Sequence, residues 1–185
     1  WVVFLACRNF GASYHHLGRE TFLAPVEWKA DEWPVVYGGE AIDTVMYAET
    51  LPLKPMKKEP SEYNFGKMKN FGPEWIHLGQ PDVKAYEFTE KGLLLNASKT
   101  THDSTEPNTW VGIRQTSPVC SYETVVDCSG LKDAAAGLSI YQINTGHADL
   151  FVTKTLKGYK VQLRMRLKAI DYIVGWDFYV GGNNG

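Results

Sequence analysis

Hydrophobic and polar residues alternate along most of this chain. In residues 159–168, tyrosine, valine, leucine and methionine occupy every second position, and basic or amide side chains lie between them. A period of two is typical of a β-strand that buries one face. We therefore expect a half-buried strand here, with a solvated basic face formed by Lys160, Gln162, Arg164, Arg166 and Lys168.

The same pattern predicts strands elsewhere in the chain. Residues 138–143 and 148–154 flank a loop at 144–147 that contains glycine, which indicates a hairpin. Further short strands are expected at residues 84–88, 92–96, 110–115, 122–128 and 170–180. The one helix-like string, residues 131–137, ends on glycine and allows a single turn at most. Many short strands separated by turns predict an all-β fold, either a sandwich or a barrel.

A change in composition divides the chain. Residues 51–73 hold four prolines and five lysines and show no strand period, which is typical of an inter-domain connection. We expect a short β piece at residues 1–50, a linker at 51–70 and a β domain at 71–185. Fifty residues are too few for a good independent core, so the first piece is expected to complete a larger unit upstream. Turn residues after the strand at 170–180 predict a returning strand.

Composition narrows the class of protein. The chain has 185 residues, 44% of them hydrophobic, and a net charge of −2, which gives no reason to expect a nucleic-acid partner. It has no apolar run of about 18 residues, so no membrane span is predicted.

Cys120 and Cys128 flank a predicted strand about 26 Å long, too far apart for a disulfide. We expect free, mostly buried thiols and, without paired Cys or His motifs, no metal ligands.

One stretch carries a specific resemblance. Residues 14–28 read YHHLGRETFLAPVEW and are followed by WPVV at 33–36. This pair of strands resembles the last blade of the five-bladed β-propeller in glycoside hydrolase family 43 enzymes of the β-xylosidase type. The later part of the chain is similar to the C-terminal concanavalin-A-like jelly-roll sandwich of those enzymes, of which we expect this chain to hold a part. The matching strings are GPEW at 72–75, QPD at 80–82, GLLL at 92–95, VGIRQ at 111–115 and AGLSIYQ at 136–142.

The resemblance implies an activity for the parent protein. Family members of this type are inverting exo-glycosidases that hydrolyse β-1,4-xylosides such as xylo-oligosaccharides, often with α-L-arabinofuranosidase activity. Inversion requires an acid and a base on opposite faces of the sugar. In the family these acids lie on earlier blades, so they are expected upstream of Trp1 and no catalytic residue is assigned here. No cofactor is expected in this chain, although the family is compatible with a divalent metal such as calcium in the parent enzyme and with homo-oligomers formed through the sandwich.

The resemblance assigns substrate-binding residues at one place. The arginine of the LGRET string, Arg19, contacts the substrate in the family, and its fork of donors suits sugar hydroxyls and carboxylates. The alternative is an ion pair with Glu20 or another acid. Adjacent histidines in a strand face opposite sides, so at most one of His15 and His16 faces the site. His16 is a weaker substrate-binding candidate than Arg19, because a simple role in a loop is favoured for it.

The tryptophans are expected mainly in packing positions. We expect Trp28 and Trp33 in a core and Trp75 as an anchor of the sandwich, whereas Trp110 suits either a core or a sugar-stacking position.

Two other functions stay open: a carbohydrate-binding module, and a structural sandwich without catalysis. The main hypothesis is the C-terminal part of a xylosidase that is inactive in isolation.

Overall fold

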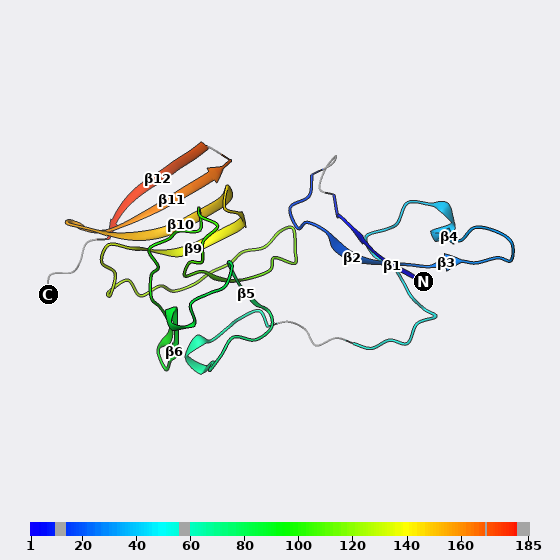
Figure 1. The fold of residues 1–185 in the computed structure, drawn as a ribbon, viewed down its shortest axis with the longest axis horizontal. Helices are drawn as coiled ribbons and strands as arrows, with labels where there is room; N and C mark the ends of the chain where they lie inside the picture. The colour runs from blue at the N-terminus through cyan, green and yellow to red at the C-terminus, as the bar shows by residue number, and fades with distance from the viewer. Residues whose placement is uncertain (10–13, 56–59, 169, 181–185) are drawn as a thin grey trace. The chain divides into compact units, whose positions relative to one another are not determined.

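The computed structural model describes residues 1–9, 14–55, 60–168 and 170–180, with the backbone alone for 174–180. Within these ranges the regular structure consists of twelve β-strands and three short 3-10 segments (Figure 1). The predicted all-β class is confirmed. No helix in the described part has the length and apolar character needed to cross a membrane. The chain divides into a first unit, Trp1–Ser61 with Gln115–Cys120, and a second unit, Glu62–Arg114 with Ser121–Gly185.

The first unit is built from two small antiparallel pairs. Strand β1 (Val2–Ala6) pairs with β2 (Glu20–Ala24), and β3 (Val26–Glu27) pairs with β4 (Val35–Val36), which leads into η1 (Tyr37–Gly39). Opposite each other on one face of β1 and β2, the rings of Phe4 and Phe22 lie 5.8 Å apart. Cross-strand aromatic pairs of this kind stabilise small sheets.

Trp28 and Trp33 are exceptions to the sequence-based expectation. Both lie in the connection between β3 and β4 and are 76% and 90% exposed. The prediction that they pack in a core is wrong for this chain, because the two-residue strands beside them offer no layer against which the indole rings could pack.

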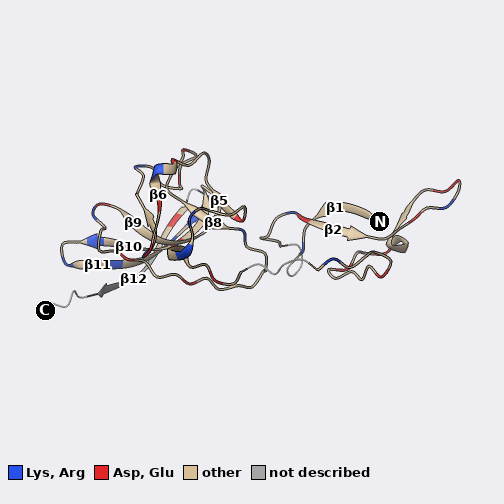
Figure 2. Cartoon of the chain, turned by 90° about the horizontal axis from the view of Figure 1, so that it is seen from below, with Lys and Arg blue, Asp and Glu red and all other residues tan. Residues whose placement is uncertain are grey.

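The second unit has two layers. A four-stranded antiparallel sheet, in the order β12 (Ile170–Val180), β11 (Gly158–Leu167), β10 (Gly146–Thr155) and β9 (Ala135–Ile143), forms one of them. The pairs β5 (Trp75–His77) with β8 (Val111–Ile113) and β6 (Tyr86–Thr89) with β7 (Gly92–Leu95), together with η2 (Phe65–Lys67) and η3 (Val83–Ala85), lie on one side of that sheet in both views (Figures 1 and 2).

Aromatic rings hold the smaller layer together. The Phe71 ring packs edge-on against His77, Tyr86 and Phe88, with centroids 4.8 to 5.6 Å apart. Trp75 extends this group, since its ring lies 4.8 Å from that of Tyr63. The predicted anchoring role of Trp75 is therefore confirmed. Edge-to-face contacts at these distances add to the stabilisation that burial of the rings provides.

The two faces of the four-stranded sheet differ in polarity. One face carries apolar side chains from neighbouring strands, and several are exposed: Leu138 (36%), Ile140 (69%), Leu150 (49%) and Tyr172 (50%). The opposite face carries Ser139, Tyr141, His147, Asp149, Arg164 and Arg166 and lies toward the smaller layer. The sheet thus exposes apolar residues and covers charged ones.

This arrangement overturns one prediction. The basic face of residues 160–168 was expected in solvent, yet the Arg164 and Arg166 side chains are only 22% and 24% exposed. The reason is charge: both guanidinium groups form ion pairs with Asp103 and Asp171. Alternation predicted correctly which residues share each face, but it predicted neither that the basic face is covered nor which acidic residues pair with it.

The exposed apolar face gives a testable expectation. In the 185-residue chain, Ile140→Thr changes the free energy of unfolding by no more than about 0.5 kcal/mol, since surface substitutions rarely do more, and lowers the fluorescence of a bound apolar dye. Phe71→Ala, in the aromatic group, costs about 3 kcal/mol. Urea unfolding measures both values. A cost for Ile140→Thr as large as that for Phe71→Ala would show that the face is covered in solution.

One local prediction failed and others held. Residues 122–128 form no strand, whereas residues 131–137, expected to form a single helical turn at most, run into β9. Val125 in the first segment is 95% exposed, so its alternating residues have no neighbouring strand to pack on, and strand preference depends on that packing. The three cysteines are free thiols, as predicted, but the expectation that they are mostly buried is wrong, because Cys120 is exposed and Cys7 and Cys128 are only partly covered. The predicted strand at 170–180 is present as β12, whereas the turn residues after it lie outside the described residues.

Candidate functional site

The first candidate site surrounds the start of β2. Gly18 has a φ of 76°, a left-handed conformation that glycine adopts without steric cost. Arg19 follows it and immediately precedes β2, so this turn determines where the Arg19 side chain leaves the backbone. Arg19 is exposed, and among the described residues no group forms a hydrogen bond or ion pair with its guanidinium.

Glu20 is bound by a different arginine. Arg8 Nε and Nη2 lie 2.7 Å from Glu20 Oε2 and Oε1, a two-pronged ion pair. Ala6 faces Glu20 in the β1–β2 register, which brings the end of β1 to this carboxylate. The alternative pairing of Arg19 with Glu20 does not form. Arg19 is thus left available for a partner outside this chain, as a substrate-binding role requires.

His16 takes part in a loop contact. Its Nε2 lies 3.1 Å from the Pro118 carbonyl oxygen and 3.3 Å from the Gln115 side-chain nitrogen. These contacts attach residues 115–120 to the first unit. A shallow depression of this unit is lined by Trp1, Pro25, Val26, Tyr47, Glu49 and Thr50, so neither His16 nor Arg19 lines it. The substrate-binding assignment of both residues stays a prediction.

The Arg8–Glu20 pair makes stability depend on pH. The hydrogen bonds from Arg8 lower the pKa of Glu20 below its ordinary value. A lowered folded-state pKa stabilises the fold above the ordinary carboxyl pKa, about 4.3, and this contribution is lost as pH falls through the lowered value. We expect Glu20→Gln to lower the urea midpoint of the first unit at pH 7 and to have no effect well below pH 4.

A matched control is available for this prediction. Glu32 belongs to an exposed pair with Lys29 at 4.0 Å, and exposed pairs of this kind contribute little. Glu32→Gln should therefore leave the midpoint unchanged at both pH values. Equal effects of the two substitutions at pH 7 would contradict the assigned role of Glu20.

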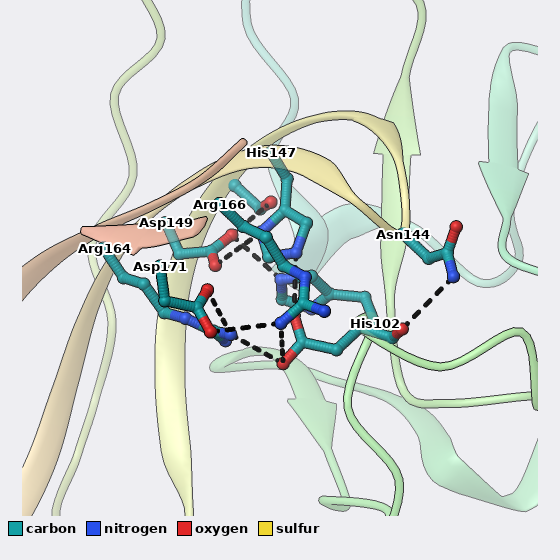
Figure 3. Close-up of polar contacts among 9 residues, drawn as sticks. His102, Asn144, His147, Asp149, Arg164, Arg166 and Asp171 are labelled. Atoms are coloured by element: carbon teal, nitrogen blue, oxygen red, sulfur yellow. Dashed lines mark hydrogen bonds and ion pairs between the residues drawn. The ribbon is translucent and has the colours of Figure 1, made fainter. Parts of the chain in front are cut away.

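The second candidate site is a polar cluster in the second unit, which we call the His–Asp cluster. Its members are His102, Asp103, Ser139, His147, Asp149, Arg164, Arg166 and Asp171 (Figure 3). His147 and Asp149 are two apart on β10 and therefore share a face. The antiparallel register places Asp149 opposite both Ser139 and Arg164, and His147 opposite Arg166. His102 and Asp103 come from the segment between β7 and β8.

His147 lies at the centre of the cluster. Its side chain is fully buried, and its two ring nitrogens each lie 2.8 Å from a carboxylate, Nδ1 from Asp149 Oδ2 and Nε2 from Asp103 Oδ1. A second histidine, His102, places Nε2 2.9 Å from Asp149 Oδ1. Ionised carboxylates only accept hydrogen bonds, so the geometry fits a His147 ring that donates from both nitrogens.

Charge within the cluster is balanced by close pairs. Burial acts to raise the pKa of Asp103, but the hydrogen bonds from Arg164 and His147 hold it below its ordinary value. Burial likewise opposes ionisation of Asp149, whose pKa is lowered by hydrogen bonds from His102 and Ser139. Both carboxylates are therefore ionised at neutral pH. Arg166 Nε is buried without a hydrogen-bond partner among the described residues.

The chemistry available to the cluster is limited by these contacts. Ser139 Oγ donates to Asp149 Oδ1 at 2.7 Å rather than to an imidazole, so it lacks the adjacent base that activates a serine nucleophile. His102, His147 and Asp149 do offer ligand atoms within 4.8 Å of one another, and no other such group occurs in the part of the chain that the structure describes. Two nitrogens and a carboxylate do not suit the calcium ion that the family resemblance allows, because calcium takes six to eight oxygen ligands.

Sequence reasoning missed this cluster. The expected loop at 144–147 put His147 outside the strand, whereas β10 begins at Gly146 and has an irregularity in its pairing with β9 between Gly146 and His147. The basic positions of β11 were the available signal, since arginines that are largely covered, as Arg164 and Arg166 prove to be, require acidic partners. His102 and Asp103 gave no signal, because the segment that holds them has no periodic pattern.

The chain is similar to known proteins over most of its length. It is 28% identical over 171 residues to the non-reducing end α-L-arabinofuranosidase BoGH43B of Bacteroides ovatus, a match that covers 91% of this chain and 32% of the relative. The chain therefore spans about a third of the length of this curated relative.

Solved structures share the fold of this chain over part of their length. The Bacteroides ovatus xyloglucan-locus GH43B structure superposes with a TM-score of 0.79 at 25% identity, over 97% of this chain and 36% of that one. The xylan β-1,4-xylosidase of Bacillus halodurans C-125 has the same fold over 97% of this chain and 35% of its own, with a TM-score of 0.77 at 23% identity. Residues 62–172 match the family model described as the β-xylosidase C-terminal concanavalin A-like domain. The chain belongs to the glycoside hydrolase family 43 proteins that carry this C-terminal domain.

Proposed function

We propose that the chain is the C-terminal part of an exo-glycosidase of glycoside hydrolase family 43. The observation that carries this proposal is the match over 91% of the chain to one stretch of an α-L-arabinofuranosidase three times as long. The matched stretch includes residues before the sandwich domain at 62–172. We assign those residues to the last blade of the catalytic propeller, as their resemblance implies.

Arg19 is the residue of this chain that we place at the substrate. It is exposed at the entry to β2 and unpaired within the described residues, while the neighbouring Glu20 is neutralised by Arg8. A free guanidinium presents several donors in a fixed fork, which suits paired sugar hydroxyls. His16, whose Nε2 contacts the Pro118 carbonyl, positions the adjacent loop and is a weaker candidate for substrate contact.

The catalytic acids belong to other parts of the parent protein. The carboxylates near Arg19 and in the His–Asp cluster form ion pairs or hydrogen bonds with neighbouring side chains. An inverting glycosidase needs one carboxylic acid and one carboxylate on opposite sides of the sugar, with room for water between them. We propose β-1,4-xylosides as substrates of the parent protein, with α-L-arabinofuranosides as the second class.

The sandwich unit acts as a structural domain in this proposal. Trp110, the candidate sugar-stacking ring, packs 5.7 Å from Tyr141, and a side chain at Gly112 would collide with it. Trp75 lies within the aromatic group around Phe71. The exposed apolar side chains of the four-stranded sheet are instead mostly aliphatic, with Tyr172 as an aromatic exception, which favours protein packing over sugar binding.

Calorimetric titration of the 185-residue chain with xylo-oligosaccharides separates these roles. We expect no saturable binding at millimolar sugar, because a single arginine without the other blades gives too few contacts. Binding that survives Arg19→Ala but disappears with Trp110→Ala would instead identify a carbohydrate-binding module. The control Trp33→Ala removes an indole that is 90% exposed and reports nonspecific stacking.

A further inference from the structure

The His–Asp cluster contains the geometry of a metal site. His102, His147 and Asp149 each present a ligand atom, and these atoms lie within 4.8 Å of one another. His147 and Asp149 are buried, and the His102 side chain is 24% exposed at the edge of the group. Two of the three ligands project from one face of β10, so a regular strand fixes their spacing.

The nitrogens that face Asp149 are the ones a metal would use. His102 Nε2 and His147 Nδ1 lie 2.9 Å and 2.8 Å from the two oxygens of Asp149. Tetrahedral ligands at about 2.0 to 2.1 Å from an ion are separated by about 3.4 Å. The three ligand atoms lie between 2.8 and 4.8 Å from one another, so side-chain shifts of roughly 1 Å would bring them to this separation around an ion. Metal binding would remove the proton from each of these two nitrogens. His147 would keep its proton on Nε2 toward Asp103, and His102 would carry its one remaining proton on Nδ1.

The surrounding hydrogen bonds match those of metal sites. Asp103 Oδ1 lies 2.8 Å from His147 Nε2, which fixes the ring with Nδ1 toward Asp149. Ser139 donates to the carboxylate of Asp149 at 2.7 Å. Asp103 is in turn held by Arg164 at 2.8 Å. Metal-binding histidines usually have a carboxylate on the other ring nitrogen, and metal-binding carboxylates are usually hydrogen-bonded.

The ligand types select the metal. Two imidazole nitrogens and one carboxylate oxygen suit Zn²⁺, which takes three protein ligands and a water in open sites. Hard ions such as Ca²⁺ and Mg²⁺ prefer oxygen ligands alone. A depression lined by Ser104, Tyr141 and Asn144, among others, borders the group, and the Tyr141 ring lies 5.9 Å from both imidazoles. The exposed edge of His102 gives a route for the ion.

We propose that His102 Nε2, His147 Nδ1 and the Asp149 carboxylate form a Zn²⁺ site in the sandwich unit. The site shares no residue with the proposed substrate contact at Arg19, and the proposal does not depend on the glycosidase activity. Its role is to hold the segment that carries His102 against β10, because it links residues that are far apart in sequence.

Calorimetry with ZnCl₂ on the chelator-treated 185-residue chain tests the proposal. We expect one ion per chain with a Kd of about 1 µM or lower, and visible absorption of the Co²⁺ form that indicates tetrahedral coordination. His102→Gln, at the edge of the group, should weaken binding at least 100-fold while the far-ultraviolet circular dichroism is unchanged. Asp103→Asn, which acts through His147, should weaken it about 10- to 100-fold.

The control is His77→Gln, since His77 contacts the Trp110 carbonyl outside the group. It should leave the Zn²⁺ affinity unchanged. Absence of Zn²⁺ binding by the folded wild-type chain would overturn the proposal. Binding that His102→Gln and Asp149→Asn leave intact would do the same, because the ion would then occupy other side chains.

Discussion

Replacing His147 by leucine lowers the free energy of unfolding of the second unit by about 3 kcal/mol. The fully buried imidazole lies between the carboxylates of Asp149 and Asp103, 2.8 Å from each. Leucine fills a similar volume but donates no hydrogen bond, so two partly buried negative charges would face each other across an apolar group. Removing one partner of a buried charged pair is far more costly than removing a surface pair.

Urea unfolding measures this loss of stability. Hydrogen exchange of the amides in β9, β10 and β11 shows that the loss occurs within the second unit. Lys154→Met is the matched control, because Lys154 lies on β10 with an exposed side chain. It should change the free energy of unfolding by no more than about 0.5 kcal/mol. If His147→Leu were as mild as this control, the His–Asp cluster would contribute nothing to the stability of the sandwich.

In the complete glycosidase, Arg19→Ala lowers kcat/KM for an aryl β-xyloside by about 100-fold. Hydrogen bonds from a charged donor contribute about 1.5 to 3 kcal/mol each when the partner would otherwise be left unpaired, and about 2.7 kcal/mol corresponds to this factor. Arg19→Lys should recover only part of the activity, since an ammonium group cannot reproduce the planar fork of a guanidinium.

Steady-state kinetics on the purified complete protein give these values. Lys29→Ala is the control, because Lys29 is a surface cation of the same unit whose partner Glu32 is also exposed. It should leave kcat/KM within about twofold of the wild-type value. If the Arg19→Ala enzyme had wild-type kcat/KM and normal stability, Arg19 would not contribute to substrate binding, and the assignment would be wrong.

Much of the fold could be predicted from periodicity. The alternation of residues 159–167 and the glycine-containing turn before β10 correctly predicted strands β9, β10 and β11, because side chains on an exposed or covered face repeat every second residue. The segment 122–128 shows the limit of this reasoning. It has strand-forming residues but no neighbouring strand, and a sequence does not state which partners are present.

The candidate sites illustrate the same limit. Arg19 could be singled out because its neighbours form a recognisable string, but the pairing of Glu20 with Arg8 follows from the β1–β2 register, which the string does not reveal. The His–Asp cluster combines four strands of one sheet with a segment more than forty positions away from His147. Its members become neighbours only through tertiary packing, so no local pattern could have assembled them.

Hydrolysis of aryl β-D-xyloside and aryl α-L-arabinofuranoside tests the central claim, that this chain is one part of a glycosidase whose catalytic acids lie elsewhere. The 185-residue chain and the complete protein are assayed side by side under identical conditions. We expect the complete protein to hydrolyse at least one substrate with inversion at the anomeric carbon, and the 185-residue chain to show no rate above buffer. Turnover by the purified 185-residue chain, abolished by substitution of one of its own carboxylates, would contradict the account.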